Sequence, residues 1–111
     1  MARLVCSLNG NFDEILKHIN DEILKGSISA SYEDGYDFNE GSVRCAVRVY
    51  ERYSYFGKNR VSLNITLLQS SSGIQICAVT SGGSQAMFWK INTVGENNFL
   101  DKLEEVILPY R

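Results

Sequence analysis

One stretch of the chain decides the fold: it reads SVRCAVRV from Ser42 to Val49, is interrupted by FGKN at residues 56–59, and resumes as RVSLNITLL from Arg60 to Leu68. Apolar and polar residues alternate in both halves. A period of two places successive side chains on opposite faces of a β-sheet, so we predict a β-hairpin with one apolar and one polar face. The apolar set comprises Val43, Cys45, Val47, Val49, Val61, Leu63, Ile65 and Leu67.

The sequence around this hairpin alternates between strand and helix signals. A strand is predicted at residues 3–8, and the helix after it begins at Asn11, a capping residue followed three positions later by Glu14. Gly26 is the expected left-handed exit of that helix. Further strands are predicted at residues 27–32, 74–80 and 86–92, residues 33–41 are predicted to be an acidic connection, and a last amphipathic helix spans residues 96–108.

Each helix has a single apolar stripe and the hairpin has a single apolar face, so these surfaces are expected to cover one another. We predict an α+β two-layer sandwich over residues 1–111, folded as one domain. An antiparallel sheet of five or six strands carries the N-terminal and C-terminal helices on one face, in the order β-α-β-β-β-β-β-α. The opposite face is predicted to be open and to carry Arg44, Arg48 and Tyr50.

Composition restricts the classes of function. The 111 residues are 44% hydrophobic and 22% charged, with a net charge of −2, which argues against nucleic acid and acidic membranes as partners. No apolar stretch approaches the length of a membrane helix. The three cysteines are odd in number and lack metal-site spacing, and His18 is the only histidine. We therefore expect a cytoplasmic protein with free cysteines, no metal and no cofactor.

Two groups of residues are candidates for binding. Arg44, Arg48 and Tyr50 on the open face are consistent with a solvated face, a dimer interface or an anion-binding surface. Tyr53 and Tyr55 at the hairpin end, together with Trp89 and the last helix, form either a cap on the core or a pocket for a small apolar or aromatic compound.

No catalytic residue is assigned, because the apolar strands carry no paired acid and base; Glu51 is their one carboxylate. The sequence therefore favours a non-enzymatic binding or interaction module that self-associates, as a homodimer. The alternative is a small-molecule-binding domain with a groove between the sheet and the C-terminal helix.

Several strings are typical of one protein family: VRCAVRVYERY from Val43 to Tyr53, NRVSLN from Asn59 to Asn64, and TSGGSQA from Thr80 to Ala86. With these strings the chain resembles a family of small bacterial proteins, mostly from Gram-positive anaerobes, that is classed as a domain of unknown function. The resemblance covers nearly the whole chain. It implies a stand-alone cytoplasmic domain and brings no activity, cofactor or catalytic residue to carry over.

Overall fold

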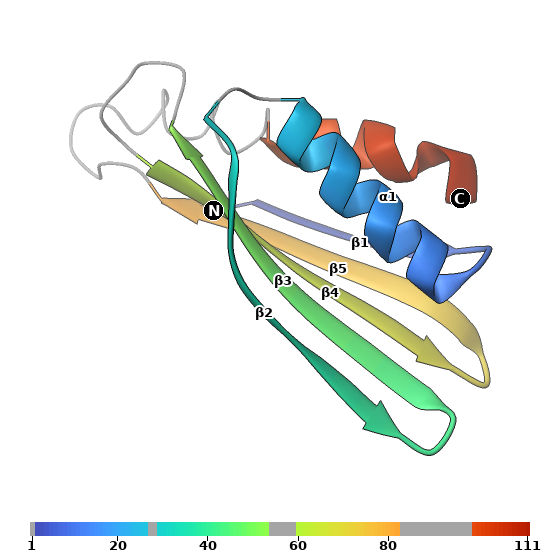
Figure 1. Cartoon of the computed structure of the whole chain (residues 1–111). Helices are drawn as coiled ribbons and strands as arrows, with labels where there is room; N and C mark the ends of the chain where they lie inside the picture. Colours follow the sequence, from blue (N-terminus) through green and yellow to red (C-terminus); the bar gives the residue numbers. More distant parts are fainter. Residues whose placement is uncertain (1, 27–28, 54–59, 83–98) are drawn as a thin grey trace.

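The computed structural model describes residues 2–26, 29–53, 60–82 and 99–111. Five antiparallel strands form one sheet in the order β1-β5-β4-β3-β2. Their bounds are β1 Ala2–Leu8, β2 Ser31–Glu40, β3 Val43–Tyr53, β4 Arg60–Ser70 and β5 Gly73–Gly82. Helix α1 (Phe12–Lys25) and a second helical stretch, residues 99–107, lie on the same side of this sheet (Figure 1). A 3-10 turn, η1, follows at Leu108–Tyr110.

Helix α1 begins as its sequence predicts. The Asn11 side chain accepts a hydrogen bond from the backbone N–H of Glu14 at 2.9 Å, which satisfies one of the free donors of the first turn. The prediction for the other end is wrong: Gly26 has a φ of −77° and is right-handed. A Cβ at this position would lie 2.5 Å from Cε of Lys102, so that flexible side chain would have to move, and 3.0 Å from the backbone oxygen of Glu22.

The core lies between the helices and one face of the sheet. Helix α1 buries Phe12, Ile15, Ile19 and Ile23, and the C-terminal helical stretch buries Phe99, Leu103, Val106 and Ile107. Strand β4 supplies Val61, Leu63, Ile65 and Leu67, each at most 1% exposed. The predicted face of β4 is therefore confirmed. The predicted helix stripes are confirmed except at Leu16 and Leu100, which are only partly buried against the core.

Strand β3 turns its other face to the core, which corrects the prediction for the hairpin. Each β3–β4 pair joins an even-numbered residue to an odd-numbered one: Ala46 lies opposite Leu67, and Tyr50 lies opposite Leu63. Opposed residues share a sheet face, so the odd-numbered valines of β3 cannot face the core together with the odd-numbered residues of β4. Val47 and Val49 therefore lie on the open face, whereas Arg44, Arg48 and Tyr50 lie on the helix side.

Strand β2 occupies the segment that was predicted to be a loop. It covers Ser31–Glu40, so most of the predicted acidic connection is an edge strand paired with β3. A bulge between Tyr32 and Asp34 inserts one extra residue, which reverses the faces of the residues beyond it. Tyr32 consequently lies on the helix side, opposite Tyr50, whereas Tyr36 lies on the open face, opposite Val47.

The strand predicted at residues 27–32 begins only at Ser31, since residues 29 and 30 are described and are not part of a strand. The other elements agree with the sequence where the structure describes them. Strand β5 lies between β1 and β4, as its apolar residues on both faces predict. The C-terminal helix is present over residues 99–107 and is followed by the turn that contains Pro109. The strand predicted at residues 86–92 lies outside the described residues. No helix in the described ranges has the length and apolar character needed to cross a bilayer.

Candidate functional site

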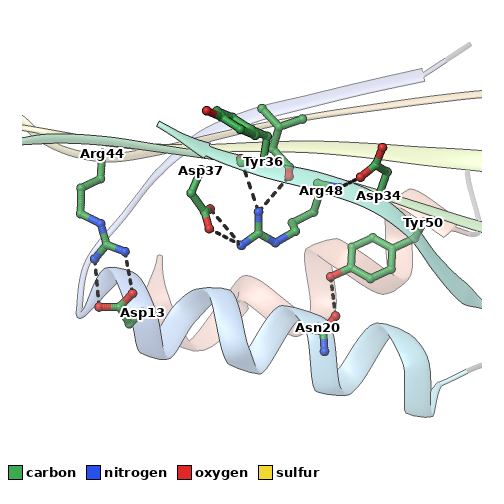
Figure 2. Close-up of polar contacts among 10 residues, drawn as sticks. Asp13, Asn20, Asp34, Tyr36, Asp37, Arg44, Arg48 and Tyr50 are labelled. Atoms are coloured by element: carbon green, nitrogen blue, oxygen red, sulfur yellow. Dashed lines mark hydrogen bonds and ion pairs between the residues drawn. The ribbon is translucent and has the colours of Figure 1, made fainter. Parts of the chain in front are cut away.

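Three arginines of β3 extend their side chains beneath the helices. Figure 2 shows Arg44 reaching helix α1, where its two terminal nitrogens donate to the two carboxylate oxygens of Asp13 at 2.8 and 2.9 Å. These hydrogen bonds lower the pKa of the Asp13 carboxyl. The Arg44 guanidinium also lies 4.4 Å from the ring centroid of Phe12, and that of Arg52 lies 4.5 Å from the ring centroid of Phe99.

Arg48 is held between strands β2 and β3. One terminal nitrogen lies 2.9 Å from a carboxylate oxygen of Asp37, and the other donates to the backbone carbonyl of Val47 at 2.9 Å (Figure 2). The side chain of Arg48 is only 17% exposed. With acceptors on both terminal nitrogens, this guanidinium has a fixed position in the wall formed by the two strands.

Tyr50 joins the sheet to helix α1. Its ring is fully buried and its hydroxyl donates to Oδ1 of Asn20 at 2.9 Å (Figure 2). Burial raises the pKa of Tyr50 to about 12, although the positive charge of Arg48 acts in the opposite direction. Tyr50 is thus a structural contact between sheet and helix rather than part of an open surface.

A groove of about 510 Å³ runs along helix α1 beside these contacts. One wall is a stripe of α1 at helical spacing, and the other is formed by Tyr32 of β2 and Arg48 of β3. The α1 residues of the lining are Asp13, Leu16, Lys17, Asn20 and Leu24. We call this feature the α1–β2 groove; its volume lies within the usual range of small-molecule sites.

The open face of the sheet is a second candidate surface, and it is largely apolar. Tyr36 is 64% exposed and Phe38 is 55% exposed, and their ring centroids lie 4.8 Å apart in an edge-to-face pair. The centre of this face carries no charged residue across the five strands. Two successive rows make up this centre: Val5, Cys77, Thr66, Val47 and Tyr36 in one, and Ser7, Gln75, Leu68, Cys45 and Phe38 in the other.

Charged residues lie around this centre. At one end of the sheet, Arg60 lies 2.9 Å from a carboxylate oxygen of Glu51 and 3.7 Å from one of Glu33. Asp34 and Glu40 stand on the open side of edge strand β2, and Arg3 stands on the open side of edge strand β1. An apolar centre with a polar, charged rim is the usual anatomy of a protein interface.

The structure separates the residues that the sequence grouped as candidate sites. Arg44, Arg48 and Tyr50 do not form an open-face cluster; of these, Arg48 lines the α1–β2 groove. Tyr53 is 54% exposed at the end of β3, on the open face, with Arg60 over its ring. Tyr55 and Trp89 lie outside the described residues, so the pocket predicted at the C-terminal helix stays a prediction.

The described residues contain no cluster of three or more histidine, cysteine or acidic side chains that could hold a metal ion. Cys6, Cys45 and Cys77 are free and partly buried. Cys45 and Cys77 lie on the open face, because Cys45 opposes Leu68 and Cys77 opposes Thr66. Their partial burial therefore results from neighbouring side chains of the sheet and not from helix cover.

Sequence reasoning missed both the apolar open face and the α1–β2 groove. A signal for the first existed in Tyr36 and Phe38, whose two-residue spacing is typical of one strand face. A signal for the second existed in Leu16 and Leu24, which lie beside the core stripe of α1 at a spacing of two helical turns.

Comparison with known proteins adds a family and no activity. No curated protein and no solved structure matches the chain. The model of one family matches residues 1–111, which is the entire sequence. The chain therefore belongs to DUF6054, a family of unknown function.

Proposed function

We propose that this protein is a non-enzymatic interaction module that self-associates through the open face of its sheet. The observation that carries the proposal is the position of its exposed apolar side chains. Eight large apolar side chains are exposed in the described part of the chain, and all except Tyr32 and Leu108 belong to the open face. Exposed apolar surface concentrated on one face is typical of an interaction site.

The size of the face fits a second copy of the same chain. Five strands at their usual spacing are about 24 Å wide, and strands of this length reach about 35 Å, which gives roughly 800 Å² per copy. Two such faces would bury roughly 1,600 Å², the area of a standard stable interface. The dimer would be a β-sandwich with sheets about 10 Å apart and strands crossing at about −30°.

The β2 edge of the sheet suits self-association less well than the open face. Strand β2 carries Glu33, Asp34, Asp37 and Glu40 and no basic residue, so two β2 edges would oppose like charges. The bulge before Asp34 further disrupts its outer edge, and the Asp34 carboxylate accepts the backbone N–H of Gly35 at 2.8 Å. Such features oppose edge-to-edge pairing, whereas the uncharged centre of the open face brings no like charges together.

The proposal includes a cytoplasmic location, which is consistent with three free cysteines. It also includes the bacterial source that the family resemblance implies. These parts can be checked separately, by localising the protein in its host.

The test is the oligomeric state of matched variants by sedimentation velocity over a concentration series. Phe38→Lys places a charge on the open face, and Leu108→Lys makes the same change at a similarly exposed residue of the C-terminal turn. We expect the wild type and Leu108→Lys to dimerise in the micromolar range and Phe38→Lys to remain monomeric. Labelling of Cys45 and Cys77 should slow as the wild-type concentration rises.

Two results would overturn the proposal. One is a wild-type protein that stays monomeric up to millimolar concentration. The other is a dimer that Phe38→Lys and Leu108→Lys weaken equally, because the contact would then lie elsewhere.

A further inference from the structure

The charges on the open face are divided between its two edges. Arg3 is the one charged residue of edge strand β1, whereas edge strand β2 presents Asp34 and Glu40 on the open side. All three side chains are exposed. In the part of the chain that the structure describes, neither Arg3 nor Asp34 has an ion-pair partner, and the Asp34 carboxylate accepts only the backbone N–H of Gly35. The open face therefore has a basic edge and an acidic edge.

One row of paired residues joins these two edges and carries a charge at each end. It comprises Arg3, Val79, Asn64, Val49 and Asp34, one from each strand. Because four strand spacings separate its ends by about 19 Å, Arg3 and Asp34 do not contact each other within one copy. The adjacent row ends in two exposed apolar side chains, Val5 at 60% and Tyr36 at 64% exposure.

Symmetry leaves two ways to pack two such faces together. A two-fold axis relates the copies and lies in the plane between the sheets. In the aligned packing of a β-sandwich, this axis runs either across the strands or along them. An axis across the strands would place β2 over β2 of the second copy, so that two acidic edges with Asp34 and Glu40 would approach each other. An axis along the strands instead places β1 over β2 of the second copy.

The axis along the strands matches the charges and the apolar side chains. Each row then lies over the same row of the second copy with its ends exchanged, so Arg3 faces Asp34 and Val5 faces Tyr36. The crossing angle of about −30° displaces the ends of a row by roughly 5 Å along the strands, which the long side chain of Arg3 can span. Arg60 at the end of central strand β4 would lie near its own copy, but its guanidinium is already paired with Glu51 at 2.9 Å.

We propose that two symmetric ion pairs, each between Arg3 of one copy and Asp34 of the other, orient the dimer so that the β1 edge of each copy lies over the β2 edge of its partner. This inference rests on the proposed self-association and adds its orientation. The apolar centre of the face supplies the attraction between the copies, whereas complementary charges at the rim determine which register is adopted.

The test is a charge exchange, with the dimer Kd measured by sedimentation velocity. Arg3→Glu places two carboxylates together at each end of the row, and Asp34→Lys places two cations there. We expect each single variant to raise Kd about fivefold or more, because both symmetric pairs are lost and replaced by repulsion. The double variant should return Kd to within about twofold of the wild type. Since the two residues lie about 19 Å apart in one copy, such a rescue arises only between copies.

Glu40→Lys provides the matched control. It makes the same charge change on the same side of β2, six residues or about 20 Å along the strand from Asp34. Arg3→Glu combined with Glu40→Lys has the same net charge as the rescuing pair but should remain as weak as Arg3→Glu alone. The difference between the wild type and Arg3→Glu should also narrow from 0.1 to 1 M salt, because the Debye length falls from about 10 to about 3 Å. Circular dichroism checks that each variant is folded.

Three results would overturn the orientation alone: Arg3→Glu that leaves Kd unchanged, a double variant that is not rescued, or an equal rescue by Glu40→Lys. Each can occur while Phe38→Lys still abolishes the dimer, so failure of this inference is distinguishable from failure of the proposed function. A wild-type protein that stays monomeric up to millimolar concentration overturns both.

Discussion

The orientation of β3 can be tested by placing the same charge at two adjacent residues. Ala46 is 1% exposed and opposes Leu67 under the helices, whereas Val47 opposes Thr66 on the open face. We predict that Ala46→Asp unfolds or severely destabilises the protein and that Val47→Asp changes its stability little. The alternation of the sequence alone predicts the reverse.

The magnitudes follow from the two environments. An uncompensated carboxylate in the core costs about 3–5 kcal/mol, a large part of the roughly 5–15 kcal/mol by which domains are stable. At this chain length, each kcal/mol lowers Tm by roughly 4 °C, so Ala46→Asp should lower it by about 12–20 °C. Aspartate at position 47 has a lower strand preference than valine and makes less apolar contact, but the face is partly solvated. Val47→Asp should therefore lower the free energy of unfolding by about 1 kcal/mol or less.

The assay is urea and thermal unfolding followed by far-UV circular dichroism. Protein is kept at low micromolar concentration and in a dilution series, so that any contribution from self-association is visible as a concentration dependence. Equal losses in the two variants, or a larger loss in Val47→Asp, would refute the register on which the open face and the groove both depend.

Three further predictions concern single contacts. The pKa of Tyr50 is raised to about 12 from an ordinary value near 10, so the folded state favours the neutral phenol. The free energy of unfolding should therefore fall as pH rises from about 10 to 12. In urea titrations, Tyr50→Phe should remove that part of the pH dependence. The pKa of Asp13 is lowered, so its pair with Arg44 should stabilise the protein above the ordinary aspartate pKa and lose this effect as pH falls. A double-mutant cycle with Asp13→Asn and Arg44→Gln should give a coupling free energy at pH 7 that vanishes in acid. A coupling free energy that does not change with pH would contradict this prediction. An ideal Cβ at Gly82 would lie 2.2 Å from a backbone oxygen, whereas Gly41 has a φ of +59° and open space around it, so thermal melts should show Gly82→Ala as far more damaging than Gly41→Asn.

Much of the local structure could be predicted from the sequence because it depends on neighbours along the chain. The cap at Asn11, the buried stripe of α1, and the strands on either side of residues 54–59 all follow from local patterns. Strand β4 was also assigned its correct face, since its alternation of apolar with polar side chains is complete. These features need no knowledge of which distant residue lies opposite.

Tertiary structure alone decided which face of β3 and β2 meets the helices. A period-two pattern marks the two faces of a strand without saying which one faces the core. The register across the hairpin decides this, because a shift of one residue moves every side chain to the opposite face. In β3 the register places Ala46 and Tyr50 inward, and the bulge in β2 puts Tyr36 outward. Arginine can occupy the inward face because its long apolar stem packs beneath a helix while its charged end reaches a carboxylate at the margin, as Arg44 reaches Asp13.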